Sequence, residues 1–87
     1  MTYTFIKLLN DLKIGREIEF KYNNEDYSIT NTAEEWQFCC NNIKLLSTTT
    51  IEELINLLRT YEIYNEILIE EIFNSSEYEK NSLYILW

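Results

Sequence analysis

The clearest structural signal in the chain is the stretch of residues 17–40, which reads EIEFKYNNEDYSITNTAEEWQFCC. Its first six residues alternate strictly between charged and apolar side chains, which is typical of a half-buried β-strand. The same alternation returns at Tyr27–Thr30 and at Trp36–Cys40. Polar clusters at Asn23–Asp26 and Asn31–Glu35 favour turns between these runs. The stretch therefore predicts a three-stranded antiparallel meander.

A helix is predicted on the N-terminal side of the meander, over Thr4–Lys13. Its apolar residues fall at i, i+3, i+4 and i+7, the spacing of one helix face. Thr2 or Thr4 can cap the start, and Gly15 follows the end, where a left-handed C-cap is expected. The apolar face consists of Phe5, Leu8, Leu9 and Leu12.

A second helix is predicted after the meander, beginning near Thr50 and ending near Arg59–Tyr61. Two pairs have the spacing of a capping box, Thr49 with Glu52 and Thr50 with Glu53. The apolar face that follows comprises Ile51, Leu54, Ile55 and Leu58.

The C-terminal third allows two interpretations. Glu62–Asn65 favours a turn followed by a helix over Glu66–Phe73, although one continuous helix over Thr50–Asn74 also fits. The apolar tail Leu83–Trp87 is expected to be ordered, either as a last strand or as a docked cover. The expected fold is α+β in a single domain over residues 1–87, with an N-terminal helix, a three-stranded antiparallel meander, two C-terminal helices and an optional terminal strand.

The composition excludes several kinds of catalytic and binding site. The chain has no histidine, so it lacks Ser-His-Asp and Cys-His catalysis and the commonest metal ligand. Its one glycine cannot build a phosphate-binding loop. Cys39 and Cys40 are neighbours, which disfavours a disulfide between them, and we expect one buried and one surface thiol. We therefore expect no enzyme activity, no cofactor and no metal site.

The charge points to a protein partner. Fifteen acidic and seven basic residues give a net charge of −8, which argues against direct binding to nucleic acid or to an anionic membrane. The sequence has no apolar run of transmembrane length and no signal-peptide pattern at its start. We therefore expect a cytoplasmic protein that acts by binding another protein.

The acidic residues gather in the C-terminal part of the chain. Residues 51–87 carry eight acidic and two basic residues, whereas residues 1–50 carry seven and five. Glu62, Glu66 and Glu70 recur every four residues, so on a helix they would stack on one face about 6 Å apart. They form either a solvated face or a surface that imitates phosphates for a basic partner. The candidate partner-binding residues are Glu62, Tyr64, Glu66, Glu70, Glu71, Glu77 and Glu79.

An alternative function is an interaction or regulatory module that does not imitate nucleic acid. One form of it is a homodimer that buries the aromatic tail Leu83–Trp87. The two functions respond differently to salt, because salt screens charged contacts much more than apolar ones.

Residues 15–20, 27–30 and 50–54, together with Tyr22-Asn23 and Trp36-x-Phe38, resemble segments of small proteins from phages and mobile elements of low-GC Gram-positive bacteria. The size, the acidity and the expected order of elements are similar to those of phage anti-CRISPR proteins. This resemblance implies an inhibitor that covers the DNA-reading site of a CRISPR effector such as Cas9, in the cytoplasm of the host cell. The residues it implies for that contact are Glu62, Glu66, Glu70 and Glu71.

Overall fold

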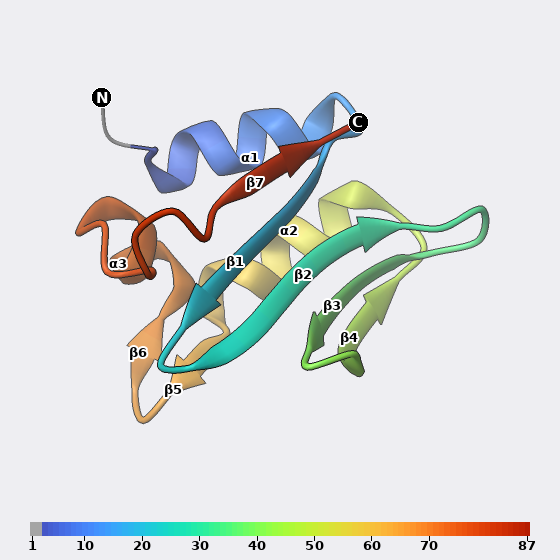
Figure 1. The fold of residues 1–87 in the computed structure, drawn as a ribbon. Coiled ribbons are helices and arrows are strands. Elements are labelled where there is room, and N and C mark those ends of the chain that lie inside the picture. The colour runs from blue at the N-terminus through green and yellow to red at the C-terminus, as the bar shows by residue number, and fades with distance from the viewer. Residues whose placement is uncertain (1–2) are drawn as a thin grey trace.

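The computed structural model describes residues 3–87, and Figure 1 shows the course of the chain. The helices are α1 (Phe5–Lys13), α2 (Ile51–Thr60) and α3 (Ile69–Asn74). The strands are β1 (Glu17–Tyr22), β2 (Glu25–Asn31), β3 (Trp36–Cys40), β4 (Ile43–Thr48), β5 (Glu62–Tyr64), β6 (Ile67–Leu68) and β7 (Tyr84–Leu86).

The fold is α+β, as predicted, and is built on a five-stranded antiparallel sheet in the order β4-β3-β2-β1-β7. Strands β1 to β4 form a four-stranded meander, and β7 joins it at the outer edge of β1. α1 and α2 lie behind the sheet in the view of Figure 1, and α3 packs against both helices. None of the helices in residues 3–87 lies on the opposite face of the sheet.

The core lies between the sheet and the helices, where alternate strand residues meet the apolar helix faces. On β1, Ile18 and Phe20 are buried while Glu19 between them is exposed, as the alternation predicts. Aromatic rings continue this layer across the sheet, because Tyr27 on β2 stacks on Phe20 at 5.3 Å and on Phe38 of β3 at 5.7 Å between ring centres.

The first two helices begin where the sequence predicts. The Thr4 hydroxyl accepts the Lys7 backbone N–H at the start of α1, whereas Thr2 lies outside the described residues. Thr50 and Glu53 form the contacts that cap α2. Gly15 has a φ of +93°, so it occupies the left-handed conformation expected after α1.

The meander has one strand more than predicted, because β4 was not recognised in the sequence. The turn that precedes β4 consists of Asn41 and Asn42, both with positive φ. Asn23 and Asn24 have the same conformation between β1 and β2, so that turn has two residues and β2 begins already at Glu25. Neither cysteine is fully buried, which corrects the expectation of one buried thiol, and both are free.

Residues 62–68 differ from both interpretations of the C-terminal third. They form a β-hairpin of β5 and β6, with Asn65 and Glu66 at its turn, both at positive φ. Those values are incompatible with a right-handed helix, so the continuous helix over residues 50–74 is wrong. The later helix exists, but it begins at Ile69 rather than at Glu66.

The tail of the chain forms a strand, as one of the two interpretations predicted. β7 pairs with β1 in antiparallel register, with Ile85 opposite Ile18. Trp87 is not buried: it is 79% exposed, and the guanidinium of Arg16 lies 4.3 Å from its ring centre. Cation–π contact rather than burial therefore holds this indole. Of the helices described in residues 3–87, none has the length and apolarity to cross a membrane.

Candidate protein-binding surface

The β5–β6 hairpin displays the first of the candidate residues. Strand alternation buries Ile63 and exposes its neighbours Glu62 and Tyr64, and Tyr64 is 50% exposed. Glu66 projects from the turn, where its own φ is +69°. Ile63 therefore anchors the hairpin to the core, while the side chains on either side of it stay accessible to a partner.

Helix α3 displays the next two acidic side chains, in its first turn. A helix N-terminus favours negative charge, so this is a stable place for Glu70 and Glu71. Glu71 also has a structural contact, since its Oε1 accepts the backbone N–H of Leu68 at 3.4 Å. This contact is one half of a capping box. The other half is missing, because the side chain of Leu68 is not polar.

The last two candidates lie on the segment that leads from α3 back to the sheet. The Glu77 backbone N–H donates to the Ile72 carbonyl at 2.8 Å, which turns the chain after the helix. The Glu79 N–H donates to the Lys21 carbonyl at 2.7 Å, and its carboxylate accepts the Asn24 N–H at 3.3 Å. Glu79 is therefore fixed beside the β1–β2 turn.

The predicted stack of carboxylates on one helix face does not exist. Glu62 is on β5, Glu66 is in the hairpin turn and Glu70 is on α3, so the spacing of four residues reflects three different elements. The structure nevertheless exposes all of the predicted glutamates. We call these six residues the acidic surface: Glu62, Glu66, Glu70, Glu71, Glu77 and Glu79.

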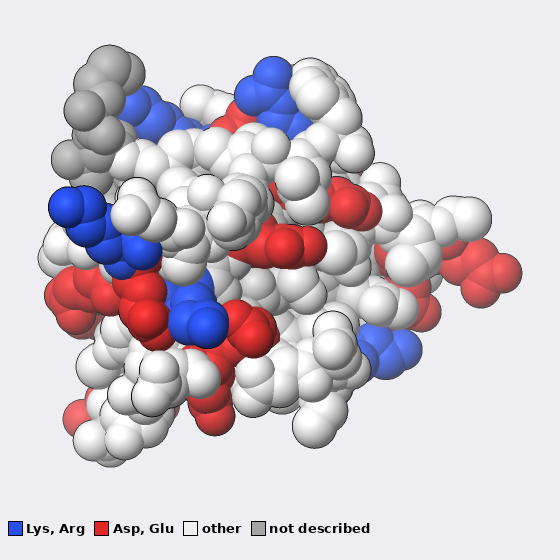
Figure 2. Space-filling model, viewed as in Figure 1, with Lys and Arg blue, Asp and Glu red and all other residues white. Residues whose placement is uncertain are grey.

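The acidic surface is electrostatically unbalanced. Residues 62–79 contain no lysine or arginine. Across residues 3–87, ion pairs join Arg16 to Asp11, Lys21 to Asp26 and Lys44 to Glu35, and none includes a member of the acidic surface. In Figure 2, red carboxylates spread over the left part of the visible face, at the end where Figure 1 places α3 and the β5–β6 hairpin, and blue basic side chains lie beside some of them.

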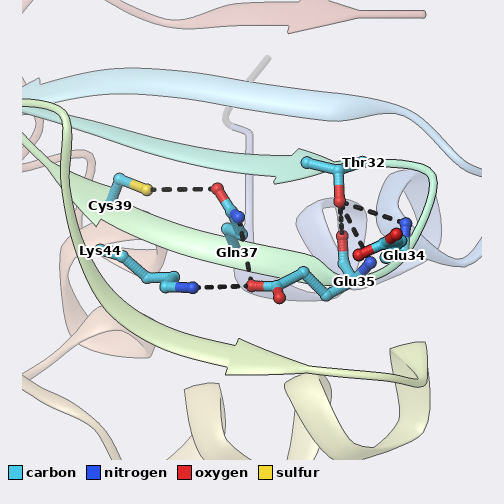
Figure 3. Close-up of polar contacts among 6 residues, drawn as sticks. All are labelled: Thr32, Glu34, Glu35, Gln37, Cys39 and Lys44. Atoms are coloured by element: carbon cyan, nitrogen blue, oxygen red, sulfur yellow. Dashed lines mark hydrogen bonds and ion pairs between the residues drawn. The ribbon is translucent and has the colours of Figure 1, made fainter.

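Glu35, outside the acidic surface, is a carboxylate whose charge is balanced by its neighbours (Figure 3). Its Oε2 accepts hydrogen bonds from Lys44 Nζ and Gln37 Nε2, both at 3.1 Å. These bonds lower the pKa of Glu35. Its backbone is bound as well, because its carbonyl accepts the Thr32 N–H at 2.8 Å and the Thr32 hydroxyl at 2.9 Å. Glu35 therefore closes the β2–β3 turn. In the acidic surface, Glu71, Glu77 and Glu79 have hydrogen bonds of their own that hold the local backbone.

A second feature, which the sequence analysis did not identify, is a groove of about 840 Å³ on the open face of the sheet. Its lining includes outward-facing residues of β1, β2 and β3 together with the segment 79–82 and Tyr84. The sequence carried one signal for it, since every outward-facing residue inside β2 is short: Asp26, Ser28 and Thr30. Glu79 lines the groove and also belongs to the acidic surface, so the two features adjoin.

Within residues 3–87, no three cysteine, aspartate or glutamate side chains are grouped so that they could hold a metal ion. Comparison with known proteins found no family model, no curated protein and no solved structure that matches the chain.

Proposed function

We propose that the protein binds a basic, nucleic-acid-binding protein through the acidic surface and thereby inhibits it. The observation that carries this proposal is the exposure of six glutamates over residues 62–79, a segment that contains no lysine or arginine. A purely solubilising surface normally intersperses both signs of charge. The carboxylates would contact lysines and arginines that otherwise bind phosphates.

Tyr64 gives this surface an anchor besides its charge. It is half exposed on the strand that carries Glu62, two residues before Glu66. Tyrosine beside carboxylates suits an arginine of the partner, since the ring can take cation–π contact while the carboxylate accepts hydrogen bonds. Charges at an interface rim mainly accelerate association, so we assign affinity chiefly to the tyrosine and selectivity for basic partners to the glutamates.

A phage-type inhibitor of a CRISPR effector such as Cas9, acting in the host cytoplasm, is the specific form of this proposal. It follows the resemblance in size, charge and helix–meander–helix order. The structure adds a fourth strand to the meander and a β5–β6 hairpin between the last two helices. Glu62, Glu66 and Glu70 lie on that hairpin and on a short helix rather than on one long helix. The proposed mode of binding depends on exposed carboxylates, whichever element presents them.

A charge-reversal experiment tests the proposal. The triple variant Glu62→Lys, Glu66→Lys, Glu70→Lys leaves the Glu71 and Glu79 hydrogen bonds in place. Tagged protein would be mixed with a purified Cas9–guide RNA complex holding fluorescent duplex DNA, and DNA release would be followed by anisotropy. We expect the native chain to displace DNA and the triple variant to fail. Displacement should weaken steeply between 0.1 M and 1 M salt, where the screening length falls from about 10 Å to about 3 Å.

A matched control separates position from net charge. The control pair is Glu34→Lys with Glu52→Lys, two exposed glutamates outside the acidic surface. It is compared with the pair Glu66→Lys with Glu70→Lys, which changes the net charge equally. Glu25 is not used, because its carboxylate accepts a hydrogen bond from the Tyr27 hydroxyl. The control pair should still displace DNA. If both pairs lose activity equally, net charge alone acts and the acidic surface is not a specific site. For other targets, the same two pairs would be compared in pull-downs from a low-GC Gram-positive lysate with salt elution.

The alternative function, a homodimeric interaction module, is favoured by one observation at β7. Its outer edge is free, and Tyr84, Ile85 and Leu86 are all exposed, with 57% exposure at Tyr84. Two copies could pair β7 with β7 across a two-fold axis. Sedimentation of the full chain would show a dimer that survives 1 M salt, and Tyr84→Lys with Leu86→Lys would dissociate it. A monomer at every concentration would exclude this function.

A further inference from the structure

The groove on the open face of the sheet follows from the register of three strands. Ser28 on β2 lies opposite Glu19 on β1 and opposite Cys39 on β3. The next outward position of β2 is Thr30, which lies opposite Gln37. Short side chains on the middle strand therefore form the floor, and longer ones on β1 and β3 stand beside it. The groove follows the direction of β2.

The wall beyond β1 is held by backbone hydrogen bonds across the end of that strand. The Lys21 N–H donates to Ser82 Oγ at 3.0 Å, and the Lys21 carbonyl accepts the Glu79 N–H at 2.7 Å. The Ser82 hydroxyl also donates to the Glu79 carbonyl at 2.6 Å. The segment 79–82 is thus fixed against the sheet, and the groove is present before any ligand binds.

The lining has the chemistry for a cationic, hydrogen-bonding ligand. Its floor offers the hydroxyls of Ser28 and Thr30, and the Gln37 amide lies beside them. Lys21 is paired with Asp26 at 3.6 Å, and Glu19 is an exposed carboxylate that has no ion pair among residues 3–87. Tyr84 lies directly opposite Glu19 on β7 and is more than half exposed. Lys80 also lines the groove, so three carboxylates, those of Glu19, Asp26 and Glu79, face two lysines, Lys21 and Lys80. The excess of one negative charge disfavours phosphate groups and therefore a nucleic acid.

We propose that this groove binds an extended, arginine-bearing peptide segment of the basic partner, lying along β2. Its arginine would donate hydrogen bonds to the Glu19 carboxylate from two of its guanidinium nitrogens and lie against the Tyr84 ring. Ser28, Thr30 and Gln37 would accept and donate hydrogen bonds to the peptide backbone. The groove volume of about 840 Å³ falls in the usual range for ligand sites. That the partner is a basic protein rests on the proposed function. Glu79 lines the groove and belongs to the acidic surface, so the two surfaces are continuous.

A direct titration tests the groove without the partner. The probe is a capped heptapeptide, Gly-Ser-Arg-Ser-Arg-Ser-Gly, and the control peptide has glutamine in place of both arginines. Binding to the full chain would be followed by the amide shifts of ¹⁵N-labelled protein. We expect saturable shifts at Glu19, Ser28, Thr30 and Cys39 with the arginine peptide. Glu19→Gln should weaken binding about tenfold, the usual loss for one charge-assisted contact.

A pair of variants tests whether the groove itself is occupied. Ser28→Tyr fills the floor and should abolish the shifts, while Asn56→Tyr adds the same ring on the exposed face of α2 and should not. The amide spectra of both variants report whether the fold is intact. Shifts confined to residues 62–79, equal shifts with the glutamine peptide, or full binding by a folded Ser28→Tyr variant would each overturn the proposal.

The outcomes for the groove and for the acidic surface are distinguishable. The pair Glu66→Lys with Glu70→Lys should leave binding of the heptapeptide at the groove within about twofold, because neither residue lines it. If the native chain fails to displace DNA from the effector while the heptapeptide still binds at Ser28, the proposed function fails and the groove stands. If DNA is displaced but the heptapeptide gives no shifts at the groove, the proposed function stands and the proposal for the groove fails.

Discussion

The Phe73 ring of α3 packs edge-on against Phe20 of β1, with 4.9 Å between the ring centres and an angle of 74° between the planes. Phe73 is fully buried and also contacts the rings of Tyr3 and Tyr78 at 6.0 and 5.3 Å. This ring therefore joins the short helix to the sheet, to the segment before α1 and to the segment after α3. It fixes the position of the helix that carries part of the acidic surface.

Phe73→Leu should destabilise the fold substantially. The variant loses three aromatic contacts and leaves a cavity, so we expect the free energy of unfolding to fall by about 1–3 kcal/mol. Urea unfolding followed by tryptophan fluorescence would measure this loss in the free energy of unfolding. Tyr64→Leu is the matched control, because its half-exposed ring should change stability by no more than about 0.5 kcal/mol. Equal stability of the two variants would contradict this role of Phe73.

Glycine should be better tolerated than alanine at Glu66. The φ of +69° there is costly for any residue with a Cβ, by about 1 kcal/mol, and is free of that cost for glycine. We expect Glu66→Gly to be more stable than Glu66→Ala by about 1 kcal/mol in urea unfolding. At Glu62 the backbone is extended, so Glu62→Gly should be no more stable than Glu62→Ala. Glu66→Ala and Glu66→Gly should weaken partner binding equally, since both remove the same carboxylate.

Glu71 and its neighbour Glu70 should differ in their effect on stability. Glu71→Ala removes the acceptor for the Leu68 N–H at the start of α3, and we expect a loss of about 0.5–1 kcal/mol. Glu70→Ala removes a carboxylate of the same helix turn that has no such bond and should cost a few tenths of a kcal/mol. Thermal unfolding of both variants measures the difference. An identical midpoint would mean that the 3.4 Å contact contributes nothing.

Two tyrosines should make the fold sensitive to alkali. Burial and a hydrogen bond to Asp11 raise the pKa of Tyr3, while burial and a hydrogen bond to Glu25 raise that of Tyr27. Because the folded pKa values exceed the unfolded value of about 10, their stabilisation is complete below pH 10. It is lost progressively as the pH rises above 10, where only the unfolded chain ionises these phenols.

Ultraviolet titration at 295 nm checks the alkaline prediction. Tyr3 and Tyr27 should ionise only as the chain unfolds. Urea unfolding of Tyr27→Phe between pH 8 and pH 11 should show a flatter dependence on pH than the native chain. A native chain whose tyrosines all titrate together, without unfolding, would exclude the effect.

The sequence predicted those elements whose signal is local. The alternation of β1 and the capping residues Thr4 and Thr50 each specify an element within a few positions, and all three are confirmed. β4 was missed because a bulge breaks its alternation: Phe38 faces Leu46 while Cys39 faces Lys44, which leaves Leu45 without an opposite residue. The Asn-Asn pair before it was the available signal, since an identical pair forms the β1–β2 turn.

The candidate surface was predicted in composition but not in geometry. The spacing of Glu62, Glu66 and Glu70 imitates a helix, yet left-handed backbone at Asn65 and Glu66 makes a hairpin there. Ile63 and Ile67 are β-branched residues that favour strands and lie on either side of that turn. The short outward-facing residues of β2 were a local signal for the floor of the groove. Its walls could not be predicted from local pattern, because they come from β1, β3 and a segment some 60 positions away along the chain.

The irregular pairing of β3 and β4 has a consequence for solubility. β4 is the longer free edge of the sheet, and Ile43 on it is 67% exposed, so a regular ladder there would invite the strands of other molecules to add. The extra residue Leu45 breaks that template, and the neighbouring Lys44 charge opposes close stacking. The other free edge, β7, is only three residues long. Edge-to-edge aggregation is thus resisted on both sides of the sheet by different means, and a change that removed the Leu45 bulge would make the chain more prone to form fibres.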